Sequence, residues 1–132
     1  MKISKAQVIT PESLLIKIER FKCFTWNSFL YKHWRKGWDA KKELEELVYW
    51  EALERCKGQK IAFDRARVTI KACFREKRRH DPDNLFVKPI LDGIVKAEIL
   101  PDDNGQVIEA LTLIALTGQK EDSITIIIEK TL

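Results

Sequence analysis

Apolar residues change their spacing between residues 39 and 74, and this change constrains the fold more than any other feature. After Asp39, which is a good N-cap residue, apolar side chains recur at helical spacing until Gly58. The members of this run are Leu44, Leu47, Val48, Ala52 and Cys56. From residue 66 to Phe74, apolar residues alternate with polar ones, which indicates a half-buried strand. A helix followed by a strand is therefore predicted here.

The segments before and after this pair carry the same two patterns. Leu14–Glu19 is rich in branched aliphatic residues and suits a first strand. Asn84–Glu98 keeps its apolar residues on one helical face, and Pro89 lies early enough in it to cost little. Two further strands are predicted at Val107–Leu116 and Ser123–Lys130. Gly118 lies between these two strands and favours an antiparallel hairpin.

The predicted order is strand, helix, strand, helix, strand, strand. This order implies a mixed sheet of about four strands with two main helices packed on it, in the α/β or α+β class. The chain has 132 residues, enough for one domain with its own core and too few for two. We therefore expect residues 1–132 to form a single domain.

Composition narrows the classes of protein. Hydrophobic residues make up 45% of the chain and charged residues 33%, which is typical of a globular protein and not of a disordered one. The three cysteines lie far apart and form no C-x-x-C pair for zinc binding or thiol exchange. No window approaches the ~18 apolar residues of a membrane span, and the first residues lack a secretory pattern. We expect a cytoplasmic protein with reduced cysteines.

The distribution of charge is more informative than its sum. The chain carries 24 Lys and Arg against 20 Asp and Glu, a net charge of +4. Basic residues concentrate in residues 20–42 and 71–79, whereas acidic residues concentrate in residues 39–54 and from Asp81 onward. This pattern predicts a basic surface beside an acidic centre, which would suit a polyanionic partner.

An acidic motif follows the second basic segment. Pro82 fixes its own φ and keeps Asp81 extended, so the side chains of Asp81 and Asp83 would point the same way. Two such carboxylates could converge on one ion, and carboxylates without a histidine or cysteine cluster favour Mg²⁺ or Mn²⁺. A third carboxylate is needed, and Asp102 and Asp103 are available to supply it.

Each of these motifs also has a purely structural interpretation. D-x-D-N before a helix is a good N-cap, and Pro-Asp-Asp-Asn-Gly is an ordinary turn sequence. Lys88 and Asp92 could form an exposed i,i+4 ion pair. The basic run before Asp81, which contains Arg75, Lys77, Arg78 and Arg79, could be a solvated face. The aromatic residues that follow the first strand could pack between that strand and the first helix. The residues alone leave these alternatives open.

Taken together, the motifs resemble the RusA family of Holliday junction resolvases. Within residues 78–107, a basic run precedes D-x-D-N-L, a lysine-bearing helix with an internal aspartate follows, and a D-D pair comes after it. The segment Trp26-Asn27-Ser28, with Tyr31, His33 and Arg35, is similar to the family's N-terminal asparagine and aromatic/basic loop.

The resemblance implies that Asp81, Asp83 and Asp103 are the catalytic, metal-binding acids, with Asp102 the less favoured member of its pair. It also implies that Lys88 is an active-site lysine that stabilises phosphoryl charge or positions the attacking water. The activity implied is Mg²⁺-dependent hydrolysis of a DNA phosphodiester, with Mn²⁺ able to substitute.

Contacts to branched DNA are predicted in two regions. The basic run would hold the phosphate backbone beside the carboxylates. The aromatic and basic residues after the first strand offer stacking surfaces and phosphate partners. The predicted contact residues are Asn27, Lys32, Arg35, Lys77, Arg78 and Arg79.

A four-way junction has approximate two-fold symmetry, so a homodimer would present two active sites. The resemblance implies the same assembly, in a bacterial or phage setting. Two other functions stay open. One is a non-catalytic module that binds branched nucleic acid and uses its aspartates as caps. The other is a metal-dependent phosphohydrolase that acts on small phosphoesters or nucleotides.

Overall fold

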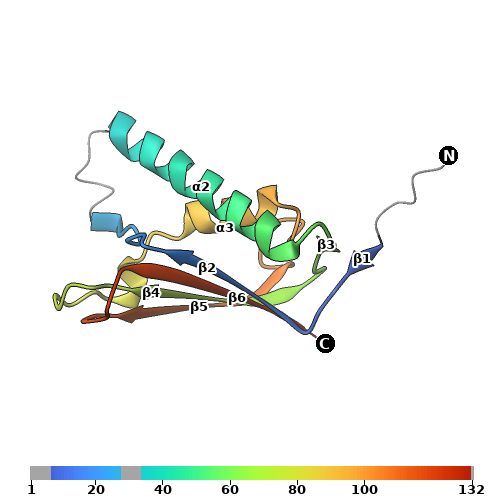
Figure 1. Ribbon diagram of the computed structural model, residues 1–132. Helices are drawn as coiled ribbons and strands as arrows, with labels where there is room; N and C mark the ends of the chain where they lie inside the picture. Colours follow the sequence, from blue (N-terminus) through green and yellow to red (C-terminus); the bar gives the residue numbers. More distant parts are fainter. Residues whose placement is uncertain (1–6, 28–33, 132) are drawn as a thin grey trace.

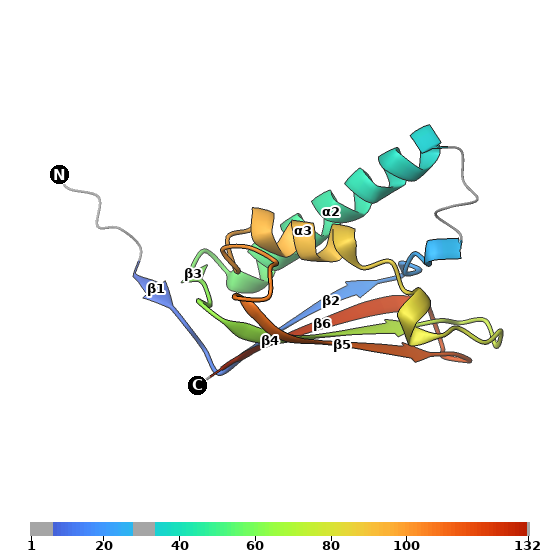
Figure 2. The same ribbon diagram turned by 180° about the vertical axis from the view of Figure 1, so that it is seen from behind.

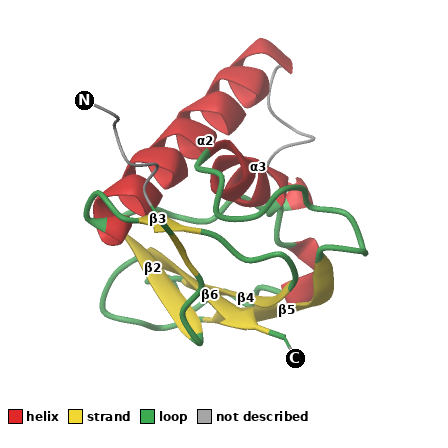
Figure 3. Ribbon diagram, turned by 90° about the vertical axis from the view of Figure 1, so that its right-hand side faces the viewer, coloured by secondary structure: helices red, strands yellow, loops and turns green. Residues whose placement is uncertain are grey.

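A computed structural model describes residues 7–27 and 34–131, with side chains described from residue 38 onward in the second range. These residues form a single α+β domain with a four-stranded mixed sheet and two main helices, as predicted. Figures 1 and 2 show both helices on one side of the sheet, and Figure 3 shows the same two layers from the end. Neither of these helices lies on the opposite face.

The sheet has the strand order β2-β6-β4-β5. Its strands are β2 (Ser13–Glu19), β4 (Ala66–Cys73), β5 (Ile108–Leu116) and β6 (Ser123–Lys130). β6 pairs antiparallel with both β2 and β4, whereas β5 pairs parallel with β4. A small parallel pair, β1 (Val8–Ile9) with β3 (Lys60–Ile61), is not anticipated by the sequence patterns.

The predicted hairpin between the last two strands is wrong, because β4 lies between them. Residues 123–126 of β6 are all buried, and buried backbone groups need hydrogen-bond partners on both edges of a strand. β2 and β4 supply those partners. The connection between β5 and β6 crosses the end of β4, where the N–H of Gly118 donates to the carbonyl of Glu76. Gly118 has a φ of +66°, which glycine adopts without strain.

The first long helix, α2 (Trp34–Cys56), begins before its predicted N-cap, Asp39. No proline lies between Trp34 and Asp39, and the single Gly37 costs a helix only about 1 kcal/mol, so the helix continues through it. The predicted apolar face is otherwise confirmed. Leu44, Val48 and Ala52 are fully buried.

The second helix, α3 (Lys88–Lys96), is shorter than the predicted Asn84–Glu98. A 3-10 turn, η1 (Pro82–Asn84), comes first, and residues 85–87 separate it from α3. Pro89 has no backbone N–H and fits only the first turn of a helix, which explains where α3 begins.

The two helices pack closely at Gly93. A Cβ at this position would lie 2.8 Å from the carbonyl oxygen of Glu45 and 2.8 Å from the Cβ of Val48, both on α2. Ile90 and Ile94 on the same helix are fully buried in the core cluster that also contains the inner face of the sheet. The position of α3 is therefore fixed by packing, and with it the position of the polar residues that it carries.

The three cysteines differ in burial. Cys23 and Cys56 are buried, Cys73 is half-buried, and all three are free thiols. Burial raises the pKa of the Cys23 thiol to about 12. In the described part of the chain, no helix is both long enough and apolar enough to cross a membrane.

Candidate functional site

The first acidic motif forms a turn between β4 and α3. Asp81 is extended (φ −87°, ψ 136°), as the following proline dictates. Asp83, however, lies inside η1, where the N–H of Asn84 donates to the carbonyl of Asp81 at 3.0 Å. The prediction that both carboxylates project from one extended segment is therefore wrong, because Pro82 also suits the first position of a helical turn. Both aspartates are exposed.

Asp81 is paired with a residue of the basic run. Its side chain makes no capping hydrogen bond to η1, so its interpretation as a side-chain cap is wrong. Its Oδ1 instead accepts a hydrogen bond from the Nε of Arg79 at 2.9 Å. The Arg79 and Asp81 side chains are 87% and 53% exposed. Such a pair contributes little to stability and can be exchanged for another partner at low cost.

Backbone hydrogen bonds connect the end of this motif to the loop that follows β2. The N–H of Phe86 donates to the carbonyl of Phe24 at 2.8 Å. Thr25 and Leu85 form an isolated antiparallel bridge. These two contacts hold the predicted DNA-contact residue Asn27, two positions further along the chain, near the acidic motif.

A cavity of about 770 Å³ lies between this loop and the acidic motif. It is lined by Asn27 from the loop, by Arg78 and Arg79 from the basic run, and by Asp81 and Asn84 from the acidic motif. The sequence places Asn27 more than fifty residues away from the other four. The structure thus brings predicted residues from two distant segments around one cavity.

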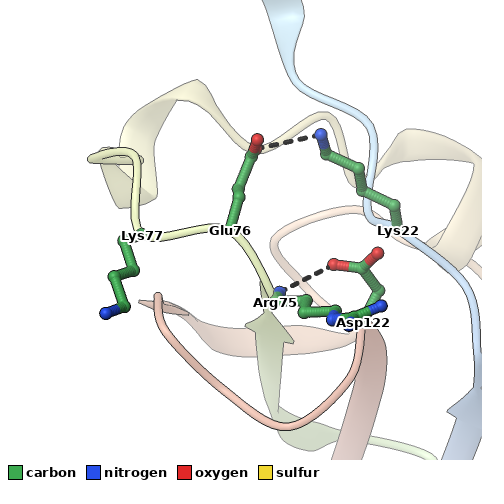
Figure 4. A pocket seen from close by; sticks show the side chains of 5 residues that line it. All are labelled: Lys22, Arg75, Glu76, Lys77 and Asp122. Atoms are coloured by element: carbon green, nitrogen blue, oxygen red, sulfur yellow. Dashed lines mark hydrogen bonds and ion pairs between the residues drawn. The ribbon is translucent and has the colours of Figure 1, made fainter.

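A second, more open cavity of about 470 Å³ shares Lys22 and Glu76 with the first. Figure 4 shows the ion pair between the Lys22 Nζ and Glu76 at 2.9 Å, and Lys77 pointing away from it. The backbone N–H of Arg75 donates to Oδ1 of Asp122 at 2.9 Å, which holds the loop after β4 against the loop before β6. Lys77 therefore lines this neighbouring cavity and not the one that contains Asp81.

Sequence reasoning missed the interactions of His80. Its ring stacks on Phe74 with the ring centroids 3.8 Å apart, and its Nε2 is 2.5 Å from Oε1 of Glu76. Hydrogen bonds from Lys22 first, and from His80 second, lower the pKa of the Glu76 carboxyl. A histidine four residues after a glutamate is too common a spacing to have revealed this network in a loop.

The second acidic motif lies in the loop between α3 and β5. The Nζ of Lys88, at the start of α3, is 2.5 Å from Oδ2 of Asp103 and 3.0 Å from Oδ1 of Asp92. The hydrogen bond from Lys88 lowers the pKa of the Asp103 carboxyl, and the bonds to Asp103 and then Asp92 raise the pKa of Lys88. The Lys88–Asp92 pair proposed as a structural alternative is therefore present, and Asp103 joins it.

Asp102 interacts with its own loop. Its Oδ1 accepts a hydrogen bond from the N–H of Asp103 at 2.7 Å, and its Oδ2 accepts one from the Nδ2 of Asn104 at 3.1 Å. The Asn104 Oδ1 in turn accepts from the N–H groups of Gln106 and Val107. Of the two aspartates, Asp103 is the one whose side chain contacts α3.

The predicted metal ligands do not gather at one point of the described chain. Among residues 7–27 and 34–131, no three His, Cys, Asp or Glu side chains are grouped so that they could hold one metal ion. Asp81 contacts Arg79, and Asp103 contacts Lys88. The donor chemistry, which consists of carboxylate oxygens, suits Mg²⁺. Binding of one ion by Asp81, Asp83 and Asp103 stays a prediction.

Two predicted DNA contacts lie partly or wholly outside the described part of the structure. Lys32 is outside the described residues, and Arg35 lies in the first turn of α2, where only the backbone is described. Of the aromatic residues, Trp26 packs its ring 4.3 Å from that of Phe86 and is still 45% exposed. It therefore contributes to packing and also presents a surface on which a base could stack.

Comparison with known proteins gave no matching family model and no matching curated sequence. The resemblance to the RusA family therefore rests on the motifs of this sequence and stays a prediction.

Proposed function

We propose that this protein is a Mg²⁺-dependent, structure-selective endodeoxyribonuclease that resolves four-way DNA junctions. The observation that supports this most strongly is the cavity in which Asp81 lies beside Asn27, Arg78 and Arg79. A carboxylate there can bind a metal ion, while an amide and two guanidinium groups can bind nucleic acid. The cations also offset the repulsion that a carboxylate alone would exert on phosphate.

In this proposal Asp81, Asp83 and Asp103 would hold the ion, which when bound would polarise the phosphodiester and lower the pKa of a bound water. Arg78 and Arg79 are exposed and would bind phosphate oxygens through their paired N–H groups. For Arg79, this contact would replace its ion pair with Asp81, freeing that carboxylate.

Lys88 would act as a cation and not as a base. The ordinary pKa of a lysine already keeps the ammonium protonated at neutral pH. It would stabilise negative charge on the phosphoryl oxygens. Asp92, at 3.0 Å, would keep Lys88 in place when Asp103 binds the metal ion.

We further propose that the enzyme is a homodimer, since two active sites are needed to cut a two-fold symmetric junction on two strands. β5 is an edge strand of the sheet, and two of its apolar side chains, Leu111 (41%) and Leu116 (38%), are exposed. An edge strand presents unpaired backbone groups to a second copy. The free thiols suit the reducing cytoplasm of a bacterium or a phage-infected cell.

A second function, non-catalytic binding of branched nucleic acid, is favoured by one observation. The ammonium of Lys88 is bound to both Asp92 and Asp103, so these carboxylates already have a cation. In a binding module they would serve to hold α3 and its following loop together. Binding would then be unaffected by chelation of divalent ions.

The proposal is tested by incubating a labelled synthetic four-way junction with the protein and Mg²⁺. We expect paired, symmetric nicks from the wild-type protein and none on linear duplex. Asp83→Asn should abolish the nicks, whereas Asp102→Asn, which alters an exposed aspartate that is not a proposed ligand, should retain them. Cleavage by Asp83→Asn at the wild-type rate would refute this metal site. Tight binding without cleavage by every form would favour the binding module.

A further inference from the structure

The cavity beside Asp81 has the size and the lining of a site for a single nucleotide. We propose that it takes one unpaired nucleotide, extruded from the centre of branched DNA, with the phosphate of that nucleotide held next to Asp81. This inference rests on the proposed function, since it assumes that DNA is the substrate. It goes further by stating how the protein would recognise the branch point.

Size and position come first. The cavity has a volume of about 770 Å³, which lies within the range of about 300–1,000 Å³ that is typical of small-molecule sites. A nucleotide can enter such a space only when it is unstacked from its neighbours. Unstacking costs least for a base that lacks a pairing or stacking partner, and the crossover of a junction interrupts stacking between neighbouring base pairs. A linear duplex offers no such nucleotide, so the cavity would select for branched DNA.

The lining includes groups that suit the phosphate and groups that suit the base of a nucleotide. Arg78 and Arg79 are exposed, as the groups that bind the phosphate should be. Arg78 forms no ion pair with any residue that the structure describes, so its guanidinium is available to an anion. Asn27 and Asn84 present amides, which can donate to and accept from the edge of a base.

Two other residues of the lining, Cys23 and Phe24, are less polar. Cys23 is buried and its thiol stays protonated, because burial raises its pKa. The ring of Phe24 is half-buried and also lines the cavity. An aromatic ring of this kind provides a stacking surface that accepts any base.

Contacts within the protein hold two of the segments that line the cavity. The backbone bond from Phe86 to Phe24 holds the loop wall. The stacking of His80 on Phe74 and its bond to Glu76 hold the opposite wall. A preformed site loses little conformational entropy on binding.

The inference is tested with 2-aminopurine, a fluorescent base whose emission rises when it is unstacked. It is placed in turn at each crossover position of a four-way junction, and at an arm position as a control. Full-length protein is added with EDTA, so that no cleavage occurs. We expect emission to rise at a crossover position and not in the arm.

A pair of matched variants tests whether the extruded base enters this cavity. Phe21 and Phe24 form an edge-to-face pair with ring centroids 5.7 Å apart, and only Phe24 lines the cavity. Each substitution, Phe21→Leu or Phe24→Leu, removes one ring of the same pair. Phe24→Leu should lose the emission change and weaken junction binding by at least about five-fold, the smallest effect expected from losing base–aromatic stacking. Phe21→Leu should keep both, and thermal unfolding checks that both variants are folded.

Each outcome bears separately on the two proposals. Junction binding without a rise in emission, or an equal rise in Phe24→Leu and wild type, overturns the inference even if the junction is cleaved with Mg²⁺. A rise that depends on Phe24 without any cleavage overturns the nuclease proposal and leaves the nucleotide site standing. Failure to bind the junction overturns both.

Discussion

The interface between α2 and α3 and the loop that carries Asp102 and Asp103 differ in what they tolerate, although α3 connects them directly. At the interface, a Cβ on Gly93 would come within 2.8 Å of the α2 backbone. In the loop, a Cβ on Gly105 would have no neighbour within 4 Å. Packing therefore fixes the position of α3, whereas a side chain added at Gly105 in the loop would meet no neighbour.

The two sides of α3 therefore contribute to different properties, one to the stability of the fold and the other to the candidate site. Ile90 and Ile94 fix α3 through complete burial, while Lys88 and Asp92 lie on its polar side. Substitutions on the buried side should lower the free energy of unfolding without changing the polar groups of the candidate site. Substitutions on the polar side should change the chemistry with little loss of stability.

The largest effect on stability is expected for Gly93→Ala. The added methyl group must displace the backbone of α2, which should cost about 1–3 kcal/mol of unfolding free energy despite the better helix propensity of alanine. Urea unfolding measures the change, with Gly105→Ala as the matched control, for which a change within about 0.5 kcal/mol is expected. Equal losses in the two variants would remove the distinction between the regions.

A smaller effect, which depends on pH, is expected for Lys88→Met. Lys88 lowers the pKa of Asp103, so the ion pair stabilises the fold above the ordinary pKa of an aspartate and loses this effect as the pH falls through the lowered value. On the alkaline side, the raised pKa of Lys88 means that stabilisation is complete below the ordinary pKa of a lysine and is lost as the pH rises through the raised value.

Urea unfolding of wild type and Lys88→Met across the pH range measures this effect. The wild type should be more stable than Lys88→Met by the largest amount between the ordinary pKa of an aspartate and that of a lysine. This difference in unfolding free energy should be less than about 1 kcal/mol, as is usual for partly exposed ion pairs. If plots of unfolding free energy against pH for the two proteins stay parallel down to strongly acidic pH, the pairing of Lys88 with Asp103 is contradicted.

The smallest effect on stability is expected for Arg79→Ala. This side chain is 87% exposed, so the unfolding free energy should change by less than about 0.5 kcal/mol. Junction binding should nevertheless weaken, and the slope of log affinity against log salt concentration should fall by about 1, because one phosphate contact is lost. Fluorescence anisotropy at several salt concentrations measures the slope, and an unchanged slope would exclude a phosphate contact by Arg79.

The sequence predicted most of the secondary structure because buried faces follow local periods. The apolar residues that alternate in residues 66–74 lie on a buried face of β4, as predicted. Those at helical spacing from Leu44 to Cys56 lie on the buried face of α2. The boundaries were less well predicted. α2 begins before Asp39, because neither a proline nor a strong helix breaker precedes that residue within the helix. A turn at Pro82 separates the acidic motif from α3, because both Pro82 and Pro89 suit the start of a helical turn.

The candidate site was predicted as separate residues and not as an arrangement. The acidic motifs and the basic run were identified from local patterns, and Asn27 from the resemblance to the RusA family. Their grouping was not, because Asn27 reaches Asp81 through backbone bonds between Phe24, Thr25 and residues 85–86. The contact between Lys88 and Asp103 also depends on the path of the loop that follows α3.

By itself, the sequence determined the two main helices and the four strands of the main sheet, which of their faces are buried, and which residue types are available for chemistry. These properties follow from spacing along the chain. Only the tertiary structure decided that β4 lies between β5 and β6, that Lys88 bridges Asp92 and Asp103, and that Asn27 shares a cavity with Asp81. The reason is that hydrogen bonds between strands and contacts between loops join residues far apart in sequence, and local periodicity does not specify such partners.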